Sequence, residues 1–354
     1  MHRLLIRLTE IIWIVFPVIA WPLHAEPGEF NEAGVLEPLA DDFPNRPITL
    51  VTDSDAASRD GIYARALQAA AQGISPVPIL ISDEPGPVNA SWIKLQSLSE
   101  RSGGEAGYYP MVTTIPGMTL QFLVEPFESK LGVDLDDLNM VLVTETVPYV
   151  LIQRKNAPWG RTFAGLVEYA RAHQGELRYT SNQVGSGNDI AMEWIMHELG
   201  FTVRKIPSPN NHVAAAAVGA GEADFTMTQA EVAVAHFRAG RIDVVLVTGD
   251  SVPPPWKDDP SVVSAEEAGL PPAPWGIMAG LAVPKKTDDE HVQWLFKLFS
   301  AAAAKEAYRL RENTIPGTKI QILGPEEANV LKHDVFSTAE PIIRKLNLHH
   351  EQRR

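Results

Sequence analysis

Short strand-like runs alternate with longer stretches of helical periodicity along most of the chain. The strand-like runs have four to eight residues and lie at 48–52, 77–81, 140–144, 147–153, 177–180, 203–206, 223–228, 244–248 and 276–283. The helical stretches lie at 61–72, 91–100, 163–172, 189–199, 213–218 and 231–238. Short strands that alternate with helices are typical of βαβ units. The pattern therefore predicts an α/β protein built on mostly parallel sheets.

A proline-rich segment and two extended segments divide this pattern. Residues 252–260 contain four prolines, which exclude a central strand or a helix interior, and we interpret them as a connector. Extended segments near Thr146 and Thr248 then link two α/β lobes. The predicted divisions are 46–146 plus 252–354 for lobe 1 and 147–251 for lobe 2.

The first 25 residues have the pattern of a secretory signal peptide. Arg3 and Arg7 form a basic start, residues 11–21 are almost wholly apolar, and the small residue Ala25 ends the segment. The apolar stretch is shorter than the ~20 residues that span a bilayer. We therefore expect cleavage between Ala25 and Glu26, an extended leader over 26–45, and a location outside the cytoplasm.

Composition excludes several classes of function. The 354-residue chain has 30 Lys and Arg against 44 Asp and Glu, a net charge of −14, which disfavours nucleic acid and anionic membranes as partners. It has no cysteine, so disulfides, thiolate metal sites and cysteine nucleophiles are excluded. The ten histidines are scattered and show no paired metal-ligand spacing. We expect neither a metal nor another cofactor.

Two polar loops, each between a predicted strand and a predicted helix, are the candidate binding elements. One covers 53–60, and the other contains Gly185, Ser186 and Gly187. The second loop does not fit the Gly-x-Ser-x-Gly pattern of a nucleophile elbow. Its backbone N–H groups can bind an anion at the helix N-terminus, or its side chains can simply cap the helix.

Ligands of open α/β folds bind at such strand–loop–helix junctions. One loop from each lobe would place a cleft between the lobes, and closure would bury a ligand there. An enzyme would also need a general base in the cleft, and the sequence identifies none. The residues alone therefore favour a binding protein.

Several segments together resemble one protein family. They are Arg46-Pro47-Ile48, Tyr179-Thr-Ser-Asn-Gln-Val-Gly-Ser186, Ala220-Gly221-Glu222-Ala223-Asp224, Ala239-Gly240-Arg241-Ile-Asp-Val-Val-Leu-Val-Thr248, Val263-Ser-Ala-Glu-Glu-Ala-Gly-Leu270 and Trp275-Gly-Ile-Met-Ala-Gly-Leu-Ala-Val-Pro284. In order and spacing they are similar to the tripartite tricarboxylate transporter receptors, also called the Bug family of periplasmic solute-binding proteins. The similarity spans nearly all of the chain after residue 45.

The resemblance implies a two-lobe periplasmic-binding-protein-like fold of type II, with a cleft for a small carboxylate between the lobes. It implies an extracytoplasmic receptor that delivers its ligand to the membrane permease subunits of a tripartite tricarboxylate transporter. Carried over by position, the ligand contacts would be Ser54, Asp55, Ser58, Arg59, Asn89, Ser181, Asn182, Gly185, Ser186, Gly187, Asn188, Asn210, Asn211 and Thr228.

The sequence departs from the family at the expected site. The family's first loop is Pro-Pro-Gly-Gly-like, whereas this one carries Asp53 and Asp55 and no glycine over 53–57, and the turn at 207–210 lacks the family's lysine. Like charges at contact distance cost several kcal/mol at an effective dielectric near 20. A di- or tricarboxylate is therefore disfavoured unless Arg59 points into the cleft. The alternatives are a ligand-sensing partner of a membrane sensor kinase, a periplasmic enzyme, or a member that has lost ligand binding.

Overall fold

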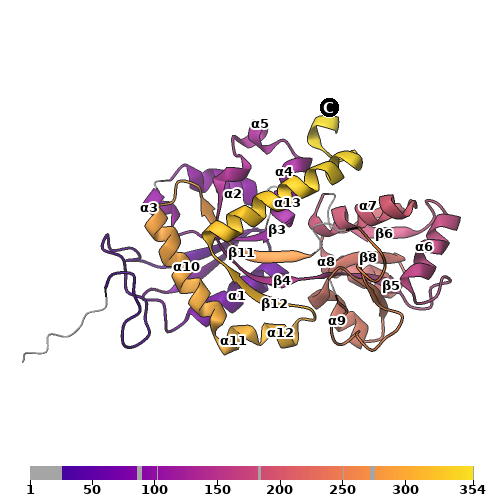
Figure 1. Ribbon diagram of the computed structural model, residues 1–354, viewed down its shortest axis with the longest axis horizontal. Helices are drawn as coiled ribbons and strands as arrows, with labels where there is room; N and C mark the ends of the chain where they lie inside the picture. The colour runs from indigo at the N-terminus through magenta and orange to yellow at the C-terminus, as the bar shows by residue number, and fades with distance from the viewer. Residues whose placement is uncertain are drawn as a thin grey trace, which may run out of the picture.

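The computed structural model describes residues 26–85, 90–101, 103–181, 185–249, 251–271 and 276–353. Two six-stranded sheets, each flanked by helices, form two lobes that lie side by side (Figure 1). The unit around the sheet of order β12-β4-β11-β3-β1-β2 is lobe 1, and the unit around the sheet of order β10-β9-β5-β8-β6-β7 is lobe 2. The predicted two-lobe α/β architecture is confirmed.

Lobe 1 contains both described ends of the chain. Its strands are β1 (Ile48–Thr52), β2 (Ile79–Asp83), β3 (Met111–Ile115), β4 (Leu138–Val147), β11 (Ile277–Pro284) and β12 (Lys319–Leu323). Its helices are α1 (Arg59–Ala71), α2 (Ala90–Ser99), α3 (Gly103–Ala106), α4 (Gly117–Val124), α5 (Phe127–Leu131), α10 (Asp289–Ala304), α11 (Glu306–Arg309), α12 (Arg311–Thr314) and α13 (Pro325–Lys345), with short 3-10 turns at Leu135–Asp137 and His350–Arg353.

Lobe 2 is built from the middle of the chain. Its strands are β5 (Tyr149–Arg154), β6 (Arg178–Ser181), β7 (Arg204–Pro207), β8 (Phe225–Gln229), β9 (Ile242–Val247) and β10 (Val263–Ser264). Its helices are α6 (Phe163–Ala172), α7 (Gly187–Leu199), α8 (Asn211–Ala220) and α9 (Ala230–Arg238). Only Pro148 separates β4 of lobe 1 from β5 of lobe 2.

Both sheets are mixed, which refines the expectation of mostly parallel sheets. β1 pairs in parallel with β2 and β3, but β11 runs antiparallel to β3 and β4. In lobe 2, β6 pairs in parallel with β7 and β8, but β5 runs antiparallel to β8 and β9. The antiparallel strands β5 and β11 follow the passages between lobes. They enter their sheets without the helical crossover that parallel neighbours need.

The sheet of lobe 2 extends past the predicted boundary at residue 251. Val263 and Ser264 of β10 pair in parallel with Leu246 and Val247 of β9. The proline-rich segment 252–260 therefore lies between two strands of the same sheet. A strand of two residues is too short to show periodicity in a sequence.

Each lobe has its own apolar core, and a smaller cluster joins them. This interlobe cluster contains Leu120, Leu123 and Val124 of α4, Ile190 of α7, and Ala339 and Ile343 of α13. Helix α13 runs along lobe 1 toward α7 of lobe 2 (Figure 1). Burial of these side chains stabilises the contact between the lobes, since apolar surface leaves water on both sides.

The predicted leader, residues 26–45, is packed onto lobe 1. Leu36 and Phe43 are buried, and the ring of Phe43 stacks on His291 at 3.7 Å. His291 Nε2 lies 2.8 Å from an Asp41 carboxylate oxygen, which fastens the segment to α10. The predicted signal peptide, residues 1–25, lies outside the described residues. Among the residues that the structure describes, no helix is long and apolar enough to cross a membrane.

Candidate functional site

A polar cavity of about 390 Å³ lies in the cleft between the lobes. Lobe 1 contributes the loop before α1, the first turn of α1, Pro85 and Gln121. Lobe 2 contributes the turn before α8 and the start of α9. The described lining residues are Asp53, Ser54, Asp55, Ser58, Arg59, Asp60, Ile62, Pro85, Gln121, Pro209, Asn210, Asn211, His212, Gln229, Glu231 and Val232.

Strand-to-helix junctions form the cavity walls on both sides. In lobe 1, Ser58 caps α1 by accepting a hydrogen bond from the Gly61 N–H at 3.1 Å. In lobe 2, Asn210 caps α8 by accepting from the Val213 N–H at 2.9 Å. Caps fix where each helix begins, because they satisfy N–H groups that have no partner inside the helix. The loops before the helices are thereby held facing the cleft.

Arg59, the first residue of α1, is enclosed by three carboxylates. Its Nη1 donates to Asp60 at 2.9 Å and its Nη2 to Glu145 at 3.2 Å, and its Nε lies 3.5 Å from Glu231. The side chain is 7% exposed. Burial alone would lower the pKa of this guanidinium, but the three carboxylates outweigh burial and raise it. Arg59 does point into the cleft, and its charge is already matched by the protein.

A second arginine holds Glu145 from behind. Arg311 donates to both Glu145 oxygens, at 2.7 and 2.8 Å, and Tyr308 donates at 3.2 Å. Burial would raise the pKa of Glu145, but these hydrogen bonds and the charges of Arg59 and Arg311 lower it. Glu145 is thus a fixed, ionised anchor for Arg59 within the sheet of lobe 1.

Two cavity residues have buried hydrogen-bond acceptors with no partner among the described residues. Both carboxylate oxygens of Glu231 and the amide oxygen of Gln121 lack a hydrogen bond and are closed to water. Burial raises the pKa of Glu231, against the opposing charge of Arg59. Burial also raises the pKa of Asp60, again opposed by Arg59. A buried acceptor without a donor is costly, so these groups favour a ligand that donates.

The structure brings six predicted binding residues together at the cavity. They are Ser54, Asp55, Ser58, Arg59, Asn210 and Asn211. Asp55 is exposed at the cavity edge, and one of its carboxylate oxygens accepts from the Ala57 N–H at 2.9 Å. Asn211 accepts from the Asn188 amide at 3.2 Å, which links the cavity wall to α7. Asn89 and Asn182 lie outside the described residues.

The other predicted residues that the structure describes lie at the start of α7 or at the ends of β6 and β8, and they are not among the described lining of the cavity. Ser186 donates to Asn188 at 2.9 Å, and Asn188 donates to the Met227 carbonyl at 2.9 Å. A Cβ on Gly187 would lie 2.5 Å from the Tyr149 hydroxyl, so this helix start is tightly fitted. The residues in this group are Ser181, Gly185, Ser186, Gly187, Asn188 and Thr228.

Sequence reasoning missed Glu231 and Gln121. Glu231 is in the first turn of α9, where an acidic residue is favourable for any helix, so nothing marked it as a cleft residue. Its position directly after a strand was a usable signal, because the same reasoning selected the loop before α1. Gln121 lies in α4, within a region that the strand and helix pattern left unassigned.

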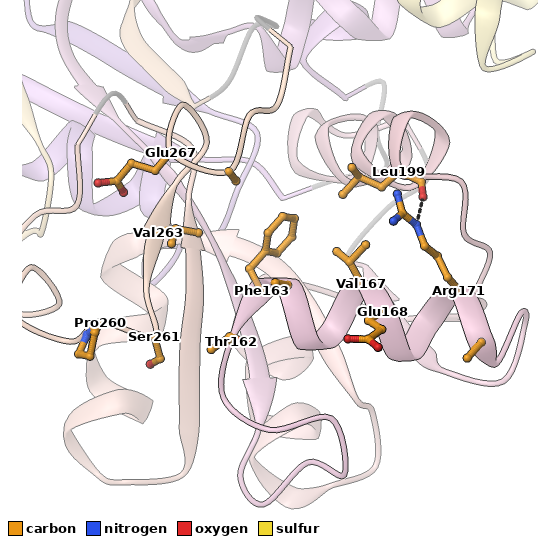
Figure 2. A pocket seen from close by; sticks show the side chains of 13 residues that line it. Thr162, Phe163, Val167, Glu168, Arg171, Leu199, Pro260, Ser261, Val263 and Glu267 are labelled. Atoms are coloured by element: carbon orange, nitrogen blue, oxygen red, sulfur yellow. Dashed lines mark hydrogen bonds between the residues drawn. The ribbon is translucent and has the colours of Figure 1, made fainter.

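A larger cavity of about 820 Å³ lies away from the cleft, on lobe 2. Phe163 and Val167 of α6 point into it, Val263 and Glu267 line its far side, and Arg171 donates to the Leu199 carbonyl at its edge (Figure 2). None of the predicted binding residues lines it. Because one lobe alone forms this pocket, closure of the lobes would not enclose a ligand there.

The fold and the cleft define the class of two-lobe solute-binding proteins. Residues 101–348 match the family described as Tripartite tricarboxylate transporter family receptor, and the chain belongs to this family. The suspected family is thereby confirmed. Its fold and family are those of receptors rather than of enzymes.

Relatives and solved structures agree with this assignment. The chain is 23% identical to a UPF0065 protein of Bordetella pertussis, over 87% of this chain and 92% of that one. It is 22% identical to Protein BugT of the same species, over 78% of this chain and 82% of that one. The periplasmic binding protein BugD has the same fold, with a TM-score of 0.73 and 18% identity over 87% of this chain and 99% of that one.

Two further structures with this fold carry small diacids. A Rhodopseudomonas palustris protein, MatC, has bound malate, and it matches with a TM-score of 0.70 and 22% identity over 85% of this chain and 100% of that one. Another R. palustris protein is described with adipate. It matches with a TM-score of 0.74 and 21% identity, over 86% of this chain and 99% of that one.

Proposed function

We propose that the protein is an extracytoplasmic receptor that captures a small organic molecule between its lobes for a tripartite tricarboxylate-type transporter. The observation that carries this proposal is the cavity of about 390 Å³ between the lobes. Arg59 of lobe 1 and Glu231 of lobe 2 both line it and pair across it. A ligand that contacts both walls would favour the closed arrangement, which is how a two-lobe receptor signals occupancy.

Delivery to membrane permease subunits and a location in the periplasm belong to the same proposal. Family membership and the N-terminal sequence pattern support them. The polar lining of the cavity supports a small polar ligand.

A thermal unfolding screen of the chain from Glu26 onward tests ligand capture. The panel should span organic acids, amino acids, amines and uncharged polar metabolites of three to eight carbons. A ligand at about 100 times its Kd adds about 2.7 kcal/mol of stability, which is readily detected. Stabilisation by at least one compound, lost on mutation of cavity residues such as Asn210→Ala, is the expected result. No stabilisation by any member of the panel would contradict the proposal.

A further inference from the structure

We propose that the cleft selects a ligand carrying an ammonium group, and that Glu231 and Gln121 receive its N–H donors. This inference rests on the proposed function, because it assumes that the interlobe cavity is the ligand site. It concerns only the charge of the ligand at that site.

The charges on the cavity wall are the first reason. Four carboxylates line the cavity, those of Asp53, Asp55, Asp60 and Glu231, against one guanidinium and one imidazole, those of Arg59 and His212. A dianionic ligand placed here would meet repulsion worth several kcal/mol at contact distance and an effective dielectric near 20. An ammonium group would meet attraction of the same size.

The second reason is that Arg59 is already paired with carboxylates of the protein. Each nitrogen of its guanidinium faces a carboxylate, Asp60, Glu145 or Glu231, at 2.9 to 3.5 Å. A ligand carboxylate that displaced one of them from Arg59 would leave it buried without its cation. Breaking a buried ion pair in that way is strongly unfavourable.

Hydrogen-bond matching is the third reason, and it is independent of net charge. The buried cavity groups without a hydrogen-bond partner are three acceptor atoms, both Glu231 oxygens and the Gln121 amide oxygen, and one donor, Arg59 Nε, which lies 3.5 Å from Glu231 Oε1. Acceptors therefore outnumber donors among these groups. The two residues come from opposite lobes, Gln121 from α4 and Glu231 from α9. An ammonium group has three donors and no acceptor, whereas a carboxylate has only acceptors. An ammonium group between these residues would satisfy both walls as the lobes close.

The test uses compounds that differ only in charge. Adipate, 6-aminohexanoate and 1,6-diaminohexane share one six-carbon chain, and equivalent series of three to eight carbons cover other lengths. Binding is measured by calorimetry on the chain from Glu26 onward. In the series that binds, we expect an ammonium-bearing member to bind about tenfold or more tightly than the diacid. Mg²⁺ and Ca²⁺ alone are included, because carboxylates also bind divalent cations.

Variants locate the ammonium group. Glu231→Gln should weaken binding of the ammonium compound about ten- to a hundredfold, as expected for a lost charge-assisted hydrogen bond. Glu222→Gln, an exposed site on lobe 2, removes the same charge away from the cavity and should leave affinity unchanged. Gln121→Leu removes an acceptor without changing charge and should weaken binding about three- to tenfold. It provides the test if Glu231→Gln fails to fold.

The outcomes separate this inference from the proposed function. Binding of diacids or uncharged compounds without binding of amines would overturn the inference and leave the receptor function standing. Stabilisation by a divalent cation alone, or an ammonium affinity unchanged in both cavity variants, would also overturn it. If no compound of any series binds, both the inference and the proposed receptor function are overturned.

Discussion

Arg59 Nε and Glu231 Oε1 lie 3.5 Å apart and join α1 of lobe 1 to α9 of lobe 2 across the cleft. The other nitrogens of Arg59 bind Asp60 and Glu145, so one guanidinium serves carboxylates from both lobes. The contact therefore contributes both to the stability of lobe 1 and to the relative position of the lobes. Opening of the cleft would expose Glu231 to water and remove its cation.

Replacement of Arg59 by Met should be strongly destabilising. The change leaves Asp60 and Glu231 without their shared cation and leaves Glu145 with Arg311 alone. Loss of one partner of a buried ion pair typically costs about 3–5 kcal/mol. Urea unfolding at neutral pH measures the loss. Arg65→Met is the matched control, because Arg65 pairs with Asp83 while 41% exposed, and exposed pairs contribute about 1 kcal/mol or less.

Glu231→Gln in the Arg59→Met background should recover part of that stability, since it removes one of the uncompensated charges. Equal losses in the Arg59→Met and Arg65→Met proteins would contradict the role assigned to the buried cluster.

Lys332 of α13 should make stability rise with pH above about 8. Lys332 is 1% exposed, and its ammonium donates to the carbonyls of Leu135 and Leu138. Burial lowers the pKa of this ammonium to about 8 from an ordinary 10.5. Between these values the unfolded chain holds more protons than the folded protein, so a rise in pH favours folding. The full effect is on the order of 3 kcal/mol.

Comparison with Lys332→Met isolates this effect. The stability of the natural protein relative to the variant should increase as the pH is raised from about 7 to about 10. In this range Lys332 loses its proton in the folded protein but keeps it in the unfolded chain. A difference that stays constant with pH would show that Lys332 keeps its ordinary pKa.

Gly187→Ala should destabilise the protein by about 1–3 kcal/mol, the usual cost of overfilling a packed site. The added methyl would lie 2.5 Å from the Tyr149 hydroxyl and 3.7 Å from Gly117 of lobe 1. Thermal unfolding gives the measurement, and Gly219→Ala in α8 gives the control. Its nearest new contact is 3.4 Å, and alanine favours a helix by about 1 kcal/mol over glycine. The two substitutions should therefore have opposite signs.

Ile343→Ala should weaken the contact between the lobes. Ile343 is fully buried in the cluster that α13 forms with α4 and α7. Truncation of a buried isoleucine to alanine costs about 2–5 kcal/mol. Val330→Ala on the exposed side of the same helix is the control, since Val330 is 55% exposed. Denaturant unfolding that gave equal losses for both would exclude a special role for the interlobe cluster.

Much of the fold could be predicted from local patterns. The strand at 48–52 and the helix at 163–172 have the predicted bounds, because strong apolar runs and clear turn residues limit them. β3 was missed, since Thr113 and Thr114 interrupt its apolar run. β12 was missed because it is an edge strand whose residues are partly exposed and mixed in character.

The two walls of the site could be predicted only separately, and their pairing could not. A polar loop between a strand and a helix marked the wall around Arg59, and Asn210 and Asn211 came from the family resemblance. The position of Glu231 opposite Arg59 depends on how the two lobes meet, 172 positions apart in the chain. Local periodicity contains no information about such a pair. The buried Glu145 beneath Arg59 is likewise set by sheet position rather than by sequence neighbours.

The leader segment has a practical consequence for experiments on this receptor. Residues 26–45 are fastened to α10, at the end of lobe 1 that faces away from lobe 2 (Figure 1). A chain immobilised on a sensor chip through a linker at Glu26 would therefore present its cleft to flowing solution, with lobe 2 free to swing. Coupling through lysines would instead include Lys345, whose ammonium contacts Glu198 of lobe 2 at 2.8 Å, and would remove this contact between the lobes.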